Sequence, residues 1–318
     1  WKVIKGNPIV IMLAILSLVV GCTINNFFSL DNLNNLMCNT TVRFLIALGV
    51  SGCLITKGTD LSAGRQAALA ATLTGVMVQR ADYASRMFSW MPEMNMWAVL
   101  LIVLVVGAII GTITGLIVAY LNVPPFIATL GIFFNDTATT EIYTNAQPIG
   151  GFTDSFKSFF NWKMLPIGSF KGFNGYILFA LLFGLIFWFM YNKTTHGKYI
   201  YAIGGNENAA EVSGVNVRVR KTLIYMTAGL MYAFAGFLMT GKSGGASASM
   251  GVSYELEAIA GCTIGGVSTT GGIGTVGGIL VGVLVFELLK IILQFVGADP
   301  NFNYIVQGLV VIVAVAKK

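Results

Sequence analysis

Charged side chains are scarce in this chain, whose 318 residues include only 10% Asp, Glu, Lys and Arg. An ordinary soluble domain carries about 25%. Hydrophobic residues make up 56% of the sequence, and the mean hydropathy is +0.79. A soluble fold of this size cannot hide so much apolar surface, so the composition excludes a soluble globular enzyme, a disordered protein and a secreted disulfide scaffold. A lipid bilayer is the remaining environment for such a chain.

Histidine and cysteine are also rare, which bears on metal and redox chemistry. The sequence holds one histidine, His196, and four cysteines, which are Cys22, Cys38, Cys53 and Cys262. No two cysteines form a CxxC pair, and three of them lie in apolar stretches, where cysteine behaves as a small hydrophobic residue. We therefore expect no disulfide framework, no metal site and no cofactor.

Long apolar runs occupy most of the chain. Because about 20 apolar residues cross a bilayer, a chain of this length with short loops allows on the order of ten membrane helices. The sequence thus predicts an all-α, polytopic membrane protein with a single transmembrane domain over residues 1–318. The eighth predicted segment is short for a span and is expected to be tilted or re-entrant. The ten segments are 8–24, 41–56, 62–79, 96–121, 124–144, 174–191, 222–240, 254–268, 271–296 and 303–316.

The distribution of Lys and Arg predicts the orientation in the membrane. Basic residues lie near both ends of the chain and in the loop 192–221, whereas the Asn-rich loop 25–39 has none. Because cytoplasmic loops are enriched in Lys and Arg, both termini and the loop 192–221 are expected in the cytoplasm. Ten crossings, six before that loop and four after it, place both termini and the loop on the same side of the membrane. The net charge of +6 reflects these loops, and we expect no nucleic-acid partner, because no basic run is interleaved with aromatics.

The fifth predicted segment is too polar for a helix that faces lipid. Its residues 135–144 read NDTATTEIYT, with two carboxylates and four threonines. One interpretation is a polar patch that faces a pore. We prefer the hypothesis of a sequence artefact, because the string matches the in-frame translation of a common sequencing-adapter oligonucleotide. Asp136 and Glu141 then have no functional role, and independent DNA that still encodes the string would refute the hypothesis.

Two further patterns do not indicate a functional site. Glycine recurs every fourth residue in three predicted segments, which lets helix backbones approach closely in a membrane. The nucleotide-binding pattern GxxxxGK[ST] matches 236–243, but an apolar helix precedes it in place of a strand, so we expect no nucleotide site. The glycine stripes are Gly107, Gly111 and Gly115; Gly261 and Gly265; and Gly274, Gly278 and Gly282.

A charged, polar turn joins the second and third predicted segments almost without a loop. Asp60 and Ser62 are typical of a helix N-cap region, where a carboxylate suits the positive helix end. Arg65 lies one turn further on, within reach of Asp60 or the carbonyl of Leu61. One reading is a capped, charge-paired turn; the other is a gate or translocation path that Asp60, Ser62, Arg65 and Gln66 line. Phe126 is a further path candidate, because two prolines place it at a helix start.

The segment 195–217 contains a short helix with clear start and stop signals. Asn206 can cap it, acidic residues occupy its first turn, and Gly214 can end it. Such a helix is rigid and presents small residues, such as Ala209 and Ala210, to a groove on a partner. We therefore predict that the loop 192–221 holds a docking element on the cytoplasmic side.

Several charged residues fall inside or beside predicted membrane segments. Glu287 and Lys290 are three residues apart, so the spacing predicts an ion pair on one helix face. Glu255 and Glu257 flank the eighth segment, and Arg43 lies near the start of the second. Spacing alone assigns these three residues no role.

Four motifs together resemble a known family of membrane permeases. They are GTDLSAGRQ at 58–66, NVPPFIATLG at 122–131, AIGGNENAAEVSGVNV at 202–217 and GGIGTVGG at 271–278. The chain resembles the permeases of bacterial ABC sugar importers, in the ribose/xylose/galactose branch. GTDLSAGRQ and YELEAIA, at 254–260, are most similar to its galactose/methyl-galactoside members. The resemblance covers nearly the whole chain apart from 133–147.

The resemblance implies a transport subunit of the bacterial cytoplasmic (inner) membrane that performs no covalent chemistry itself. Such permeases work as a pair of identical or similar subunits, with two ABC ATPase subunits docked from the cytoplasm. A periplasmic or lipid-anchored sugar-binding protein delivers a monosaccharide from outside. The capped helix matches the element that couples the family's permease to its ATPase. Its residues in this sequence are Gly204, Gly205, Asn206, Glu207, Ala209, Ala210, Ser213 and Gly214.

Two other classes of function compete with this interpretation. A stand-alone secondary carrier or channel for a small polar solute predicts coupling carboxylates at the bilayer midplane and broken helices in two repeats. The sequence shows no convincing carboxylate pair of that kind, and a carrier has little use for a capped cytoplasmic helix. A membrane-embedded enzyme needs convergent His, Asp, Glu or Cys residues, which a chain with one histidine in a loop does not offer.

Overall fold

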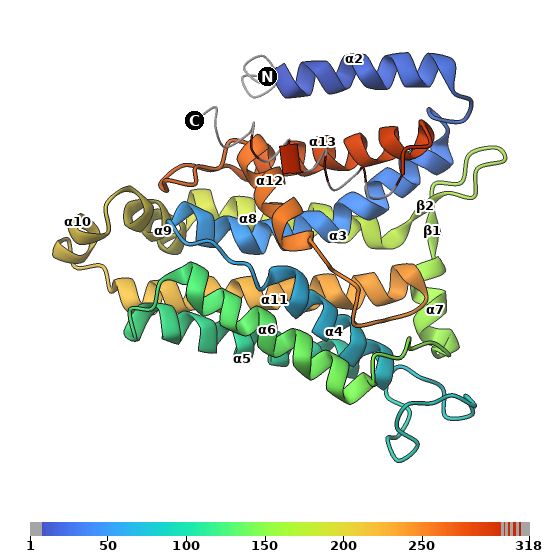
Figure 1. The fold of residues 1–318 in the computed structure, drawn as a ribbon, viewed down its shortest axis with the longest axis horizontal. Helices are drawn as coiled ribbons and strands as arrows, with labels where there is room; N and C mark the ends of the chain where they lie inside the picture. Colours follow the sequence, from blue (N-terminus) through green and yellow to red (C-terminus); the bar gives the residue numbers. More distant parts are fainter. Residues whose placement is uncertain (1–7, 300–301, 303–304, 306–307, 310–311, 313–318) are drawn as a thin grey trace.

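The computed structural model describes residues 8–299 together with 302, 305, 308, 309 and 312. These residues form a bundle of α-helices, most of which run along one long axis (Figure 1). Nine of the ten predicted segments contain a helix, and the tenth, 303–316, lies largely outside the described residues. The main helices are α2 (Pro8–Thr23), α3 (Leu30–Ile55), α4 (Ala63–Met77), α5 (Met96–Tyr120), α6 (Pro125–Thr144), α8 (Leu178–Lys193), α11 (Val217–Ser243), α12 (Tyr254–Ile264) and α13 (Val276–Phe295).

Five helical stretches among the described residues are long and apolar enough to cross a membrane. α6 has 20 residues but does not join them, because residues 135–144 make it too polar. α4 and α12 have 15 and 11 residues. At 1.5 Å per residue they extend about 22 and 16 Å, less than the roughly 30 Å hydrocarbon core. The five candidate spans are Leu30–Ile55, Met96–Tyr120, Gly175–Lys193, Val217–Ser243 and Val276–Phe295.

α3 begins at Leu30, well before the predicted start at residue 41. Ser29 caps it, and the Ser29 hydroxyl accepts a hydrogen bond from the backbone N–H of Asn32 at 3.2 Å. The Asn-rich segment 25–39 is therefore mostly helix rather than loop. The expectation failed because polar residues on one face of these turns conceal the apolar face that packs on the bundle.

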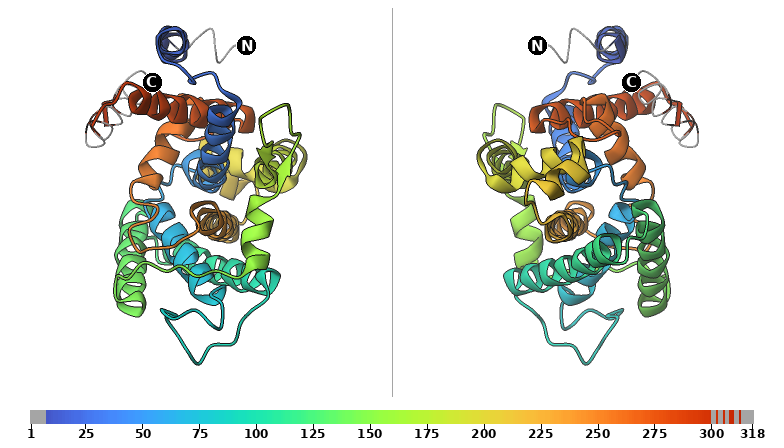
Figure 2. Two further views of the ribbon diagram at one scale, coloured as in Figure 1. Left: turned by 90° about the vertical axis from the view of Figure 1, so that its right-hand side faces the viewer. Right: turned by 90° about the vertical axis from the view of Figure 1, so that its left-hand side faces the viewer.

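α11 lies near the centre of the bundle, as the two views along the long axis of the bundle show (Figure 2). It packs against α3, α4 and α5. The contact with α5 depends on the glycine stripe predicted from the sequence. A Cβ atom at Gly107 would lie 2.5 Å from the carbonyl oxygen of Gly229, and one at Gly111 would lie 2.3 Å from that of Tyr225. Larger residues at these positions would force the two helices apart.

α12 and α13 use the second pair of glycine stripes in the same way. A Cβ atom at Gly282 would lie 1.9 Å from the carbonyl oxygen of Gly261, and one at Gly265 would lie 2.2 Å from that of Gly278. The short α12 is thereby held against a full-length helix. The 236–243 match to the nucleotide-binding pattern lies wholly within α11, where its backbone N–H groups cannot cradle a phosphate.

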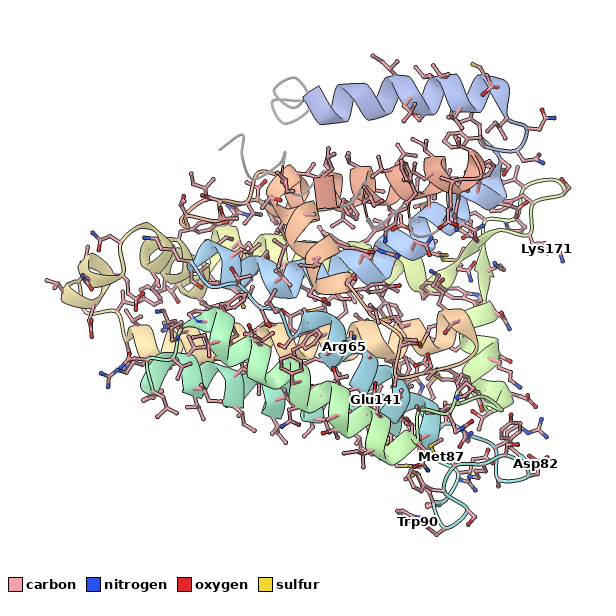
Figure 3. The ribbon with its side chains drawn as sticks, viewed as in Figure 1. Arg65, Asp82, Met87, Trp90, Glu141 and Lys171 are labelled. Carbon is pink, nitrogen blue, oxygen red and sulfur yellow. The ribbon has the colours of Figure 1, made fainter. Side chains whose placement is uncertain are left out.

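The two ends of the bundle carry different connecting elements. α9 (Thr195–Gly205) and α10 (Glu207–Val212) lie at one end. The loop that carries Asp82, Met87 and Trp90 lies at the other, as does the turn with Lys171 (Figure 3). That second end also holds α7 (Asp154–Asn161), the two-residue strands β1 (Lys163–Met164) and β2 (Phe173–Asn174), and the 3-10 turn η1 (Gly175–Ile177).

Candidate functional site

α9 and α10 form a compact projection whose helix signals act as the sequence predicts. The Asn206 side chain accepts a hydrogen bond from the backbone N–H of Ala209 at 3.1 Å, which caps α10. Glu207, in the first turn, accepts from Lys221 at 2.7 Å. α10 ends at Val212, and Gly214 follows with a φ of +86°, a left-handed conformation that glycine adopts without strain. The predicted capped helix is confirmed.

A small apolar cluster holds α10 on the projection. Ile203 of α9, Ala210 of α10 and Val217 of α11 are all buried and pack together. Ala209 faces solvent, and Val212 is 90% exposed. Ala210 therefore supports the projection from beneath, whereas Ala209 and Val212 form its outer face. Sequence reasoning missed Val212, although an apolar residue next to a helix C-terminus and a glycine is a visible signal.

Gly204 joins the projection to the bundle at a very close backbone contact. A Cβ atom there would lie 1.8 Å from the carbonyl oxygen of Ile55 and 2.5 Å from the backbone nitrogen of Gly272. Gly272 itself donates to the Ile55 carbonyl at 2.8 Å, and the Tyr201 hydroxyl donates to the Gly274 carbonyl at 2.8 Å. The end of α3, the loop before α13 and α9 thus meet at one point. A displacement of the projection is transmitted directly to α3 and to this loop.

Gly205 and Ser213 complete the predicted coupling set, and they differ from Gly204. Nothing lies within 4 Å of a Cβ atom built at Gly205, so that position is open. The Ser213 hydroxyl donates to the Ala209 carbonyl at 2.7 Å, which closes the end of α10. The residues predicted to couple therefore divide into buried supports and an exposed face.

The turn before α4 is buried and closed by its own hydrogen bonds. One Asp60 carboxylate oxygen accepts from the backbone N–H and the hydroxyl of Ser62, at 2.9 and 2.6 Å. The other accepts from the Tyr232 hydroxyl of α11 at 2.9 Å, and Gln66 donates to the Ser62 hydroxyl at 2.7 Å. Arg65 pairs with neither of its expected partners, because it donates to the carbonyl of Ala248 at 3.3 Å. Asp60 therefore ties the turn to the central helix.

Polar atoms without a partner gather where α4 and α12 begin. Among the described residues, Arg65 Nε, Gln66 Oε1 and Glu255 Oε2 are buried and make no hydrogen bond. Glu255 Oε2 would lie 2.1 Å from a Cβ atom at Gly64, so this carboxylate reaches the first turn of α4. Figure 3 shows Arg65 near the middle of the bundle, between α4 and α6. The sequence alone assigned Glu255 no role; the structure places it where the starts of α4 and α12 meet.

Phe126, the last predicted path residue, lies apart from this group. It is in the first turn of α6, and its side chain is 54% exposed. Thr129, one turn further on, accepts from the backbone N–H of Leu61 at 3.2 Å and so fixes α6 to the turn before α4. The structure thus brings Asp60, Ser62 and Gln66 together and leaves Phe126 on the outer surface of the described chain.

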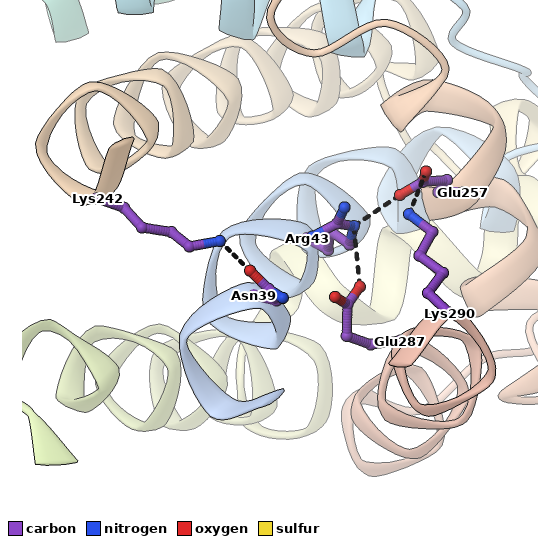
Figure 4. Close-up of polar contacts among 6 residues, drawn as sticks. All are labelled: Asn39, Arg43, Lys242, Glu257, Glu287 and Lys290. Carbon is purple, nitrogen blue, oxygen red and sulfur yellow. Dashed lines mark hydrogen bonds and ion pairs between the residues drawn. The ribbon is translucent and has the colours of Figure 1, made fainter. Parts of the chain in front are cut away.

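Four charged side chains meet inside the bundle (Figure 4). Arg43 of α3 contacts Glu257 of α12 at 2.6 Å and Glu287 of α13 at 3.1 Å. Lys290 pairs with Glu257. The predicted pairing of Glu287 with Lys290 is wrong, because each finds its partner on another helix. Arg43 also lies over the ring of Tyr254, 4.6 Å from its centroid. Two positive and two negative groups neutralise one another, which lets them occupy a membrane interior.

Comparisons with known proteins agree with this arrangement. The family described as "Branched-chain amino acid transport system / permease component" matches residues 32–315. The chain is 43% identical over 320 residues to the galactose/methyl galactoside import permease protein MglC of Haemophilus influenzae, covering 99% of this chain and 94% of the relative. It is 44% identical over 316 residues to MglC of Escherichia coli, covering 98% and 93%.

A more distant relative defines the branch. The chain is 34% identical over 310 residues to the ribose import permease protein RbsC of Escherichia coli, covering 96% of this chain and 91% of the relative. No solved structure matches the chain. On the extent of these matches, the chain belongs to this permease family, in its ribose/galactose branch.

Proposed function

We propose that this chain is the permease subunit of an ABC importer that carries galactose or a methyl-galactoside-like monosaccharide across the cytoplasmic membrane. The capped projection of α9 and α10 is the observation that carries the proposal, because it is rigid, exposed and fixed to the bundle through Gly204. The relatives named as galactose/methyl galactoside import permeases support the choice of sugar.

The partners follow from the same proposal. Two ABC ATPase subunits bind the exposed faces of α10 in a pair of permease subunits, and a sugar-binding protein docks at the opposite end of the bundle. ATP-driven closure of the ATPases displaces the projections and shifts the paired bundles between inward-open and outward-open arrangements. We propose ten membrane crossings with both termini in the cytoplasm, on the side of α9 and α10.

For the translocation path, we propose that Arg65 and Gln66 face the sugar, with Asp60 and Ser62 fixing the turn that positions them. This proposal is supported by the hydrogen bonds that occupy Asp60 and by the unpartnered atoms of Arg65 and Gln66. Phe126 is proposed to line the path from its exposed position at the start of α6.

Co-purification with the ATPase tests the proposal. The chain is co-expressed with the sugar-importer ATPase from the same source, and we expect a detergent-stable complex with both subunits in equal amounts. Ala209→Arg places a charge on the outer face of α10 and is expected to abolish both ATPase binding and uptake. Ala84→Arg is the matched control for ATPase binding, because Ala84 is an exposed alanine of the loop that carries Asp82 and Met87, at the other end of the bundle.

The outcomes separate an importer subunit from a stand-alone carrier. If the folded, monodisperse chain binds no ATPase yet takes up sugar on its own in liposomes, it is a secondary carrier. Normal ATP-dependent uptake by Ala209→Arg would show that α10 is not the docking element. Gly204→Trp is expected to abolish uptake as well, but by displacing the projection from α3.

A further inference from the structure

A polar groove lies between the start of α3 and the end of α13, and neither the coupling element nor the path residues include it. The groove is a cavity of about 340 Å³. Pockets for small ligands span about 300–1,000 Å³. The start of α3 and the end of α13, whose residues line the groove, lie at the end of the bundle opposite α9 and α10 (Figure 1). Its lining includes five amide side chains and an aromatic ring, from Asn26, Asn32, Asn35, Asn39, Gln294 and Phe295.

The amides are arranged by helix geometry. Asn32, Asn35 and Asn39 follow an i, i+3, i+7 spacing, which places them on one face of α3. Asn34 points elsewhere, and its amide donates to Asn174 at 2.9 Å as part of the fold. Within the described part of the chain, the Asn35 side chain makes no hydrogen bond. Asn32 donates to the carbonyl of Phe27 at 2.7 Å, and Asn39 accepts from Lys242 (Figure 4), so packing engages one half of each of these two amides. Within the described chain, the side-chain oxygen of Asn32, the NH2 group of Asn39 and the whole Asn35 amide stay available to a ligand.

The chemistry of the lining excludes lipid and disfavours ions. Amides and the carboxylate of Asp31 are costly in hydrocarbon, so the groove must be filled by water or by a polar ligand. No Lys or Arg is among its lining residues. Lys242 reaches Asn39 from outside this lining, and a single ammonium, in a groove that also carries the Asp31 carboxylate, makes a poor anion site. Asp31 is its one carboxylate, too little charge for a tight Ca²⁺ site.

A neutral sugar fits the same lining. Together the amides of the groove offer both donors and acceptors, and each sugar hydroxyl needs both. Phe295 and Ile291 supply apolar surface for the C–H face of a sugar ring. We propose that this groove is an outer, low-affinity site for a neutral monosaccharide, which the sugar enters on leaving its binding protein. The inference rests on the proposed function, since it takes the transported sugar to be the ligand.

Cysteine protection tests the groove directly in the assembled transporter. Asn35→Cys is introduced together with Cys22→Ser, which removes the exposed native thiol; Cys38, Cys53 and Cys262 are buried. A membrane-impermeant maleimide is applied from outside. Galactose is expected to slow labelling at position 35 at least two-fold. The same concentration of betaine, which has no hydroxyl group, is expected to leave the labelling rate unchanged. Ala84→Cys, in the exposed loop at the same end, is expected to label at one rate throughout.

Each adverse result has a distinct meaning. Equal labelling rates at position 35 with and without galactose would overturn the groove as a sugar site. Protection by the sugar-free binding protein alone would also overturn it, because the groove would then be a docking surface. Failure of the maleimide to reach position 35 in the assembled transporter would also overturn the proposal, because the groove would then be closed to a sugar from outside.

A separate measurement keeps this test independent of the proposed function. ATP-driven galactose uptake by the unmodified transporter in liposomes tests the importer itself. If uptake occurs and galactose does not protect position 35, the groove proposal fails alone. If no galactose is taken up, the proposed function fails first.

Discussion

Asp136 is the most unfavourably placed side chain in α6, and its replacement is expected to stabilise the protein. The residue is 4% exposed, and within the described chain its Oδ2 atom makes no hydrogen bond. It lies close enough to Asp60 for the two carboxylates to repel each other. Asp60 is already satisfied by Ser62 and Tyr232, so Asp136 gains nothing from its burial.

The size of the effect follows from this environment. An unsatisfied buried polar group costs about 1–3 kcal/mol, and an acid at the centre of a membrane helix costs about 2.5–3.5 kcal/mol on insertion scales. We therefore expect Asp136→Leu to raise the free energy of unfolding by about 1–3 kcal/mol. Asp136→Asn, which keeps the volume and removes the charge, is expected to raise it by less.

The buried cysteines provide the assay. In a Cys22→Ser background, which lacks the exposed native thiol, Cys38, Cys53 and Cys262 become reactive only on unfolding. A thiol-reactive fluorophore then reports the thermal midpoint in detergent. Glu141→Gln is the control, because it removes one negative charge from an exposed position of the same helix and is expected to stay within about 0.5 kcal/mol of the parent. An Asp136→Leu midpoint at or below that of the parent would refute the reasoning.

The same result bears on our proposal that residues 135–144 are foreign to the gene. A buried, unpaired carboxylate is unfavourable unless it serves a function, and this hypothesis gives Asp136 none. Sequencing of independent DNA decides the origin of the string. The stability measurement decides whether the protein tolerates it or is weakened by it.

Three further predictions concern the end of the bundle with α9 and α10. Gly204→Ala is expected to lower the free energy of unfolding by about 1–3 kcal/mol, because its Cβ atom would clash with the Ile55 carbonyl. Gly205→Ala, with open space around its Cβ atom, should leave the thermal midpoint unchanged. Equal midpoints for the two variants would contradict the close contact at Gly204. Val212→Arg is expected to reduce ATPase co-purification at least ten-fold with no change in the thermal midpoint, and undiminished binding would exclude Val212 from the interface. Burial lowers the pKa of His196, so below pH 6.5 the unfolded chain binds more protons than the folded one. The thermal midpoint should therefore be constant above pH 6.5 and fall as the pH drops below it. A His196→Leu variant should lose this fall, and an unchanged pH profile of the variant would contradict the role of His196.

Local signals in the sequence predicted the local structure well. The apolar runs located the helices, and Asn206 predicted the start of α10. The glycine stripes predicted close helix contacts, and the structure shows them between α5 and α11 and between α12 and α13. Each of these features depends on residues within one or two helical turns, which a sequence displays directly.

Contacts between distant parts of the chain could not be predicted in this way. Arg43 and Glu257 are 214 residues apart, and nothing in their spacing indicates that they meet. Glu287 and Lys290 were predicted to pair because they are neighbours on one helix, but each pairs with a residue of another helix in the bundle. Glu255 gained significance only when α4 and α12 were found to begin side by side.

The ion cluster also bears on how the protein is made. Arg43 is synthesised long before Glu257 and Glu287, the carboxylates that neutralise it in the folded bundle. At about 5–20 residues per second, the 214 residues from Arg43 to Glu257 take roughly 10–40 s to translate. During that interval an isolated α3 would carry an unpaired guanidinium in lipid. An α3 released before α12 and α13 are made would bear this cost, about 2.5–3.5 kcal/mol for an Arg at a helix centre on insertion scales, until the two carboxylates arrive.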